Sequence, residues 1–139
     1  MSGACYIEYP VPLGLCDGTV TGIEGNQESI RWAEKNAQQA GNSARFLVAD
    51  VRQALKQLVH QGEKADIILL DPPRSGVGKQ ISLLPQLKPA KIIYVSCDPA
   101  TLARDLNILC AQDFRVTQVI PVDMFPQTSH IESVVVLEQ

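Results

Sequence analysis

The feature that most constrains this chain is a set of four short apolar runs, each followed by a polar residue and then by a helical pattern. The runs cover residues 19–23, 46–49, 67–70 and 91–96. Continuous apolar strands that alternate with helices are typical of a parallel sheet with helices on both faces. The sequence therefore predicts an α/β fold with a mostly parallel sheet.

Capping residues place the intervening helices. Asn26 and Asp50 are suited to cap the first two helices, and Asp98 followed by Pro99 is suited to begin the last one. Between them we predict a short helix over residues 78–84, ended by Pro85. Apolar spacing predicts the buried positions of the first and last helices as Ile30, Ala33, Ala37, Ala40, Leu102, Ala103, Leu106, Leu109 and Cys110.

The two ends of the chain differ from this pattern. Residues 114–122 and 133–137 read as two strands with no helix between them, which predicts an antiparallel pair at one sheet edge. Residues 1–18 are interrupted by proline and glycine, and only residues 4–9 are suited to a short strand. We therefore expect an irregular segment over 1–18 and one domain over 19–139.

Composition narrows the class of protein. The 139 residues suit one domain, and 45% apolar with 19% charged residues is typical of a globular protein. No secretory signal or membrane-spanning run is present, so the expected location is the cytoplasm, with reduced cysteines. A net charge of −3 argues against a broad basic surface for nucleic acid. It does not exclude a nucleic-acid enzyme whose binding surface lies in another domain. The cysteine and histidine spacing predicts no metal site.

Chemistry is expected where the strands end, because ligands collect at the carboxyl ends of parallel strands. Glu24, Asp50, Asp71 and Cys97 follow or end these strands. The three acids are suited to the hydroxyls and ring edge of a nucleoside-like ligand, and each also has a plain interpretation as a cap or turn residue. The glycine motifs of NAD and ATP sites are absent from the sequence, which disfavours both classes.

Cys97, His130 and Glu132 are candidates for catalysis. Cys97 directly precedes a helix start, where the helix dipole favours an anionic nucleophile; the alternative is a buried structural cysteine. Cys110 lies on the apolar stripe of the last helix and is interpreted as structural. His130 and Glu132 close a polar loop and suggest a general acid or base, with a solvated hairpin loop as the alternative.

Three segments then resemble a known family. The sequences DPPR at 71–74, SCDPATLARD at 96–105 and DMFPQTSHIE at 123–132 resemble signature blocks of the RNA (uracil-5-)-methyltransferases. That family makes 5-methyluridine in tRNA and rRNA with S-adenosyl-L-methionine. The resemblance implies a Rossmann-like methyltransferase fold with a C-terminal antiparallel hairpin and a first strand that is truncated or missing.

The resemblance also implies roles for individual residues. Cys97 matches the thiolate that adds to carbon-6 of uracil, and Glu132 matches the base that removes the carbon-5 proton. Glu24 matches the acid that holds the cofactor ribose, and Asp50 matches the polar residue near the adenine. Asp71 matches a residue that contacts the cofactor or the target base.

The chain also departs from the family pattern. Asp98 stands where family members have asparagine, and the segment from Cys5 to Pro10 lacks both glycines of the family's cofactor loop. The family's upstream RNA-binding parts have no counterpart. We therefore expect a C-terminal catalytic portion with a damaged cofactor loop; the alternative is a catalytically impaired remnant that acts as a binding module.

Two other expectations follow from the same comparison. A methyltransferase acting on an amino group would want an aromatic residue at the position of Arg74, so this class is disfavoured. A missing central strand would leave an open sheet edge, which invites pairing with a second copy of the chain.

Overall fold

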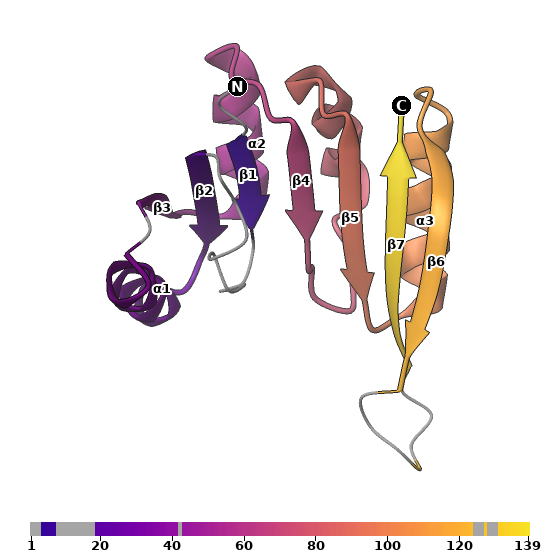
Figure 1. Ribbon diagram of the computed structural model, residues 1–139. Helices are drawn as coiled ribbons and strands as arrows, with labels where there is room; N and C mark the ends of the chain where they lie inside the picture. The colour runs from indigo at the N-terminus through magenta and orange to yellow at the C-terminus, as the bar shows by residue number, and fades with distance from the viewer. Residues whose placement is uncertain (1–3, 8–18, 42, 124–126, 128–130) are drawn as a thin grey trace.

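The computed structural model describes residues 4–7, 19–41, 43–123, 127 and 131–139. Seven strands form one sheet in the order β3-β2-β1-β4-β5-β7-β6 (Figure 1). The strands are β1 (Ala4–Ile7), β2 (Thr19–Glu24), β3 (Ala44–Val48), β4 (Ile67–Leu70), β5 (Lys91–Ser96), β6 (Arg115–Val122) and β7 (Glu132–Glu138). Strands β1 to β5 are parallel, whereas β7 runs antiparallel to both β5 and β6. The predicted antiparallel pair at the C-terminal end is confirmed.

The helices lie on both faces of this sheet. Helix α1 (Gln27–Gln39) lies in front of the sheet, and α2 (Val51–His60) and α3 (Pro99–Cys110) lie behind it (Figure 1). A 3-10 helix, η2 (Gly78–Leu87), packs between α2 and α3. None of the helices in the described ranges has the length and apolar character needed to span a bilayer.

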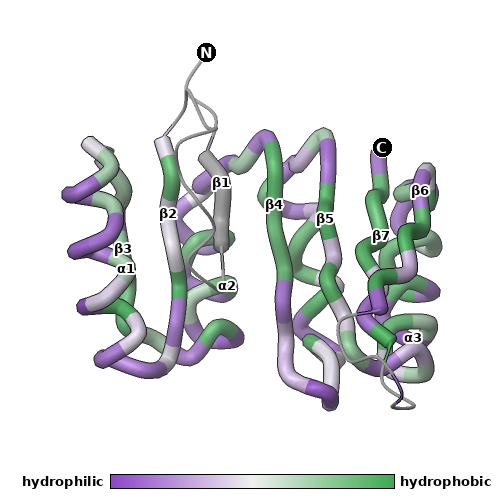
Figure 2. The backbone as a smooth tube through the Cα atoms, turned by 60° about the horizontal axis from the view of Figure 1, so that its bottom comes forward, coloured by the Kyte–Doolittle hydropathy of each residue, from purple (hydrophilic) through white to green (hydrophobic). Residues whose placement is uncertain are grey.

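The core lies between the sheet and the rear helices. In β5 and β7 every second residue is buried, and the apolar and aromatic ones pack with the apolar faces of α2, η2 and α3. Figure 2 shows β4 as hydrophobic along its length and the loop that follows it as mostly hydrophilic. The fold therefore presents polar loops at the carboxyl ends of a buried central sheet.

Strand β1 occupies the centre of the sheet. It is only four residues long, and it pairs in parallel with β2 on one side and β4 on the other. Cys5 therefore lies within a strand rather than in a loop. Because β1 fills this place, the described sheet is continuous from β2 to β4, and the open edge expected from a missing central strand is not there.

The predicted helix caps are confirmed. Asn26, Asp50 and Asp98 adopt extended backbone conformations, and their side chains accept backbone N–H groups of the first helical turn. The prediction that Pro85 ends the third helix is wrong, because η2 continues to Leu87. Pro85 begins the last 3-10 turn, where a missing N–H costs little, and its carbonyl accepts the N–H of Lys88.

The predicted buried stripe of α3 needs a correction. Leu102 and Leu109 are buried as expected, but Ala103 and Cys110 are exposed. The fully buried position between the two leucines is taken by a charged residue, Asp105. The helix is therefore rotated about its axis relative to the prediction, so that a carboxylate enters the core.

Candidate functional site

Three of the predicted site residues lie at the end of the sheet where β4 and β5 finish. Asp71 follows β4, Cys97 follows β5, and Glu132 is the first residue of β7. Strand β7 pairs with β5 so that Ser96 lies opposite Ser133, which places Cys97 and Glu132 next to the same residue pair. A thiol and two carboxylates, which are far apart in the sequence, thus share the carboxyl-end side of β4 and β5.

The negative charge of Glu132 acts on Asp71. The pKa of Asp71 is raised, first by partial burial and second by the negative charge of Glu132. Glu132 is itself half-buried. The arrangement favours a proton on Asp71 compared with an isolated aspartate, so this carboxyl group is suited to proton transfer.

The turn that carries Cys97 is held on both sides. The Ser96 hydroxyl donates to the carbonyl of Asp98 at 3.1 Å, and the N–H of Asp98 donates back to Ser96 Oγ at 3.2 Å. Asp98 caps α3, and the N–H and hydroxyl of Thr101 hold the pKa of its carboxyl below the ordinary value. Cys97 is a half-buried free thiol within this rigid turn.

The remaining predicted acids, Glu24 and Asp50, lie at the ends of β2 and β3. Glu24 Oε1 accepts the N–H of Asn26 at 2.7 Å. Asp50 Oδ1 accepts the N–H groups of Arg52 and Gln53 at 3.0 and 3.2 Å. Both acids therefore have the local turn or cap role that the sequence allowed, and each has a second carboxylate oxygen that these bonds do not use.

A cleft of about 360 Å³ lies between the start of α2 and the loop after β4. Its volume is within the roughly 300–1,000 Å³ of small-molecule sites. Asp50 and Arg52 supply charged groups, while valine and proline side chains supply apolar walls; the lining residues are Gly25, Asp50, Val51, Arg52, Pro72, Pro73, Gly76 and Val77. The combination of apolar walls with a few polar groups is suited to a small heteroaromatic ligand.

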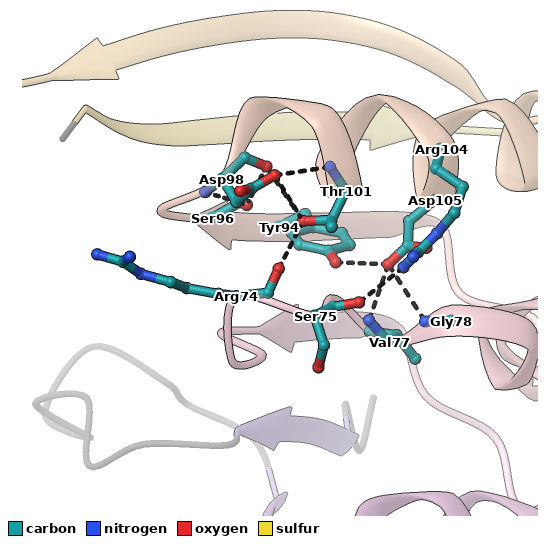
Figure 3. Close-up of polar contacts among 10 residues, drawn as sticks. All are labelled: Arg74, Ser75, Val77, Gly78, Tyr94, Ser96, Asp98, Thr101, Arg104 and Asp105. Carbon is teal, nitrogen blue, oxygen red and sulfur yellow. Dashed lines mark hydrogen bonds and ion pairs between the residues drawn. The ribbon is translucent and has the colours of Figure 1, made fainter. Parts of the chain in front are cut away.

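A buried network that the sequence interpretation missed joins the loop after β4 to α3 (Figure 3). The Asp105 carboxylate, which is fully buried, accepts the Tyr94 hydroxyl at 2.7 Å and the Val77 N–H at 2.8 Å. Arg104 pairs with the other oxygen of Asp105 at 2.8 Å and donates to the carbonyl of Ser75 at 2.9 Å. Burial, followed by the contact with Asp105, raises the pKa of Tyr94.

One signal for this network was present in the sequence. Asp105 lies three residues after Leu102 and four before Leu109, so a charge occupies a position on the apolar face of the helix. A charged residue at such a position needs buried partners. The partners themselves were not predictable from spacing, because Val77 is 28 residues away.

Other predictions fall outside the described residues. His130 and residues 8–10 of the expected cofactor loop belong to this group. Among the residues that the structure describes, no cluster of three or more histidine, cysteine or acidic side chains is arranged to hold a metal ion.

The sequence of this chain is similar to those of known RNA methyltransferases. Residues 23–139 match the family described as tRNA (uracil-5-)-methyltransferase. An uncharacterized RNA methyltransferase of Caldanaerobacter subterraneus is 43% identical over 86% of this chain and 27% of its own length. The 23S rRNA (uracil(1939)-C(5))-methyltransferase of Shewanella frigidimarina is 41% identical over 94% of this chain and 29% of its own length.

A solved structure of a uracil methyltransferase has the same fold as this chain. The Pyrococcus abyssi tRNA (uracil-54, C5)-methyltransferase, in complex with S-adenosyl-L-homocysteine, superimposes with a TM-score of 0.82 and 31% identity. The match covers 99% of this chain and 34% of that protein. The predicted Rossmann-like methyltransferase fold is therefore confirmed, and this chain spans about a third or less of the relatives it matches. The chain belongs to the tRNA (uracil-5-)-methyltransferase family.

Proposed function

We propose that this chain carries the catalytic site for methylation of carbon-5 of uridine in tRNA or rRNA. The observation that carries the proposal is that Asp71, Cys97 and Glu132 lie together on the carboxyl-end side of β4 and β5, beside the cleft that contains Asp50. The names of its relatives, which act on uracil in tRNA and 23S rRNA, support this substrate class. RNA is then the partner, and selection of the RNA belongs to the whole protein.

The described residues fit S-adenosylmethionine as the methyl donor. Val51 and Pro72 line the cleft and would pack against an adenine ring, and the Asp50 carboxylate would accept a hydrogen bond from its amino group. Glu24 lies beside Gly25 of the same cleft, where its second oxygen is suited to ribose hydroxyls. When bound, this cofactor supplies an activated methyl group on a sulfonium centre.

Cys97 is proposed as the nucleophile. Carbon-5 of uracil is itself a poor nucleophile, and addition of a thiolate to carbon-6 moves an electron pair onto carbon-5. That pair would form the new bond to the methyl group while the methyl–sulfur bond breaks and S-adenosylhomocysteine leaves. The turn between β5 and α3 fixes the thiol at the helix N-terminus, where the backbone favours negative charge. The fixed position reduces the entropy lost when the bond forms.

Glu132 is proposed as the base, and Asp71 as its partner. After methyl transfer, carbon-5 carries both a proton and the new methyl group. Removal of that proton by Glu132 returns the electron pair to the ring and expels the Cys97 thiolate, so that the double bond is restored. Asp71, whose pKa is raised, is suited to contact the target base or the cofactor beside them.

Covalent trapping tests this proposal. RNA containing 5-fluorouridine, incubated with the chain and S-adenosylmethionine, should give an adduct that persists, because fluorine replaces the proton that Glu132 would remove. Peptide-resolved mass spectrometry should place the adduct on Cys97, and the C97A variant should show none. Exposed Cys110 is a control within the same chain. An adduct on Cys110, or one that survives C97A, would overturn the assignment.

The alternative of a binding module rests on the segment Cys5 to Pro10, which lacks the glycines of the family's cofactor loop. In the family pattern, glycine backbone would approach the methionine part of the cofactor closely, and larger side chains at the corresponding sequence positions would weaken that contact. Calorimetric titration with S-adenosylhomocysteine separates the two functions. Binding in the micromolar range supports catalysis, whereas no binding at millimolar ligand rejects catalysis and favours the module.

A further inference from the structure

We propose that Asp105 is a positioning residue that holds the loop after β4 against α3, the helix that follows Cys97. The inference rests on the proposed function and extends it to a residue that touches neither RNA nor cofactor. One end of this loop carries Asp71 and lines the Asp50 cleft, and the loop then continues into η2. Asp105 thereby fixes the cleft relative to the nucleophile.

The contacts of Asp105 Oδ2 lead to this loop, to the start of η2 and to the strand beneath them. Its Oδ2 accepts the N–H groups of Val77 and Gly78 at 2.8 and 3.4 Å, together with the Tyr94 hydroxyl at 2.7 Å. A carboxylate oxygen with several donors in the buried interior forms stronger bonds than a neutral acceptor. The loop backbone is therefore tied to β5 and α3 through one atom.

Arg104 and Thr101 add contacts on the outer side of the loop. Arg104 donates to the Ser75 carbonyl at 2.9 Å, and the Thr101 hydroxyl donates to the Arg74 carbonyl at 2.9 Å (Figure 3). Both donors lie on the first two turns of α3, which starts two residues after Cys97. Helix α3 thus begins just after the thiol and binds the loop along its side.

Gly76 shows that the loop and the carboxylate are fitted to each other. Its φ is +70°, and a Cβ added there would stand 2.6 Å from Asp105 Oδ2 and 2.7 Å from Arg104 Nη2. Any side chain at this position would push the loop away from Asp105. Gly62 has the same φ of +70° but nothing within 4 Å of an added Cβ, so it offers a matched control.

The positioning role predicts an effect on rate rather than on RNA affinity. Asp105 is fully buried, so it has no access to RNA. Displacing the loop should misalign the cofactor cleft with Cys97, and a misplacement of about 1 Å costs on the order of 100-fold in rate. The RNA concentration that gives half the maximal rate should stay the same.

The test compares D105N, G76A and G62A in the full chain. The maximal rate of the Cys97 adduct with 5-fluorouridine RNA, and the half-saturating RNA concentration, are measured for each variant at a temperature where circular dichroism shows all of them folded. We expect D105N and G76A to lower the maximal rate about 10-fold or more, with half-saturation within about twofold of the unsubstituted chain. G62A should retain the unsubstituted rate, although it has the same backbone strain.

The outcomes are distinguishable. Equal maximal rates for D105N, G76A and the unsubstituted chain would overturn the positioning role and leave the proposed function intact. A change confined to half-saturation would also overturn it, because that result assigns Asp105 to RNA binding. Absence of any adduct in the unsubstituted chain would reject the proposed function, and the positioning role with it.

Discussion

The two halves of the candidate site are built in different ways. In the β2–β3 half, defined here by Glu24 and Asp50, each carboxylate bonds to backbone N–H groups two or three residues away, on the surface. In the β4–β5–β7 half, defined by Asp71, Cys97 and Glu132, the turn that carries Cys97 also has local bonds, but the loop after β4 is held by bonds between residues 27 to 29 positions apart. Their donors and acceptors on α3 are Thr101, Arg104 and the buried Asp105.

This difference separates local folding signals from tertiary ones. Caps such as Asn26 and Asp50 form with their own helix, because the donors lie in the next turn. The loop after β4 acquires its shape only when α3 has docked behind β5. The loop that begins at Asp71 is therefore the part of the candidate site whose geometry depends on the whole fold.

The largest expected effect comes from removing the buried carboxylate of Asp105, which should lower the free energy of unfolding. D105A removes a buried carboxylate and leaves the Tyr94 hydroxyl and the Val77 N–H without their acceptor. Loss of one partner of a buried charged network costs about 3 kcal/mol. Urea unfolding followed by circular dichroism should show this loss; a change below about 1 kcal/mol would mean that the network contributes little.

A smaller effect is expected from Y94F. The variant keeps the ring in the core and removes only the hydroxyl that donates to Asp105 at 2.7 Å. A hydrogen bond to a charged group contributes about 1.5–3 kcal/mol, so the unfolding free energy should fall by about 2 kcal/mol. Combined with D105A, the Y94F change should cost much less than it does alone, since its acceptor is then absent. Simple additivity of the two variants would contradict a shared network.

In the β2–β3 half, N26A and D50A should each cost about 1 kcal/mol, as is usual for loss of a helix cap. The two caps belong to different helices and share no hydrogen-bond partner. Their effects should therefore add in urea unfolding. Strong coupling between them would show that this half is also organised by tertiary contacts.

The smallest expected effects concern pH. The raised pKa of Asp71 favours the folded protein below the ordinary value of 3.8, and this contribution is lost as the pH rises through the folded-state pKa. The lowered pKa of Asp98 has the opposite sign, because its contribution is present above 3.8 and is lost as the pH falls. At pH 7, D71N should therefore raise the melting temperature slightly and D98N should lower it. Shifts of the same sign would contradict these assignments.

The sequence predicted elements with local signals better than the contacts between them. The bounds of β4 and β5 follow from uninterrupted apolar runs, and three helix caps follow from residue type. The end of η2 was missed because Leu87 is fully buried and holds the last turn beyond Pro85. These differences arise where packing outweighs local preference.

The site shows the same division. Strand-end position and the family resemblance singled out Cys97 and Glu132, and the sheet register places each of them next to the Ser96–Ser133 pair. Neither spacing nor residue type revealed that Asp105 hydrogen-bonds to the end of the loop after β4, because its partners come from β5 and from the start of η2. The roles of Asp105, Arg104 and Gly76 are visible only when the elements are assembled.

The central claim is that Cys97 adds to the base and Glu132 completes the reaction at the same site. Intact mass spectrometry of E132Q, after incubation with uridine-containing RNA and methyl-labelled S-adenosylmethionine, tests it most directly. The account predicts that a covalent RNA complex carrying the labelled methyl group accumulates on Cys97, because the carbon-5 proton is not removed. Release of methylated RNA by E132Q at the rate of the unsubstituted chain, with Cys97 free throughout, would contradict it.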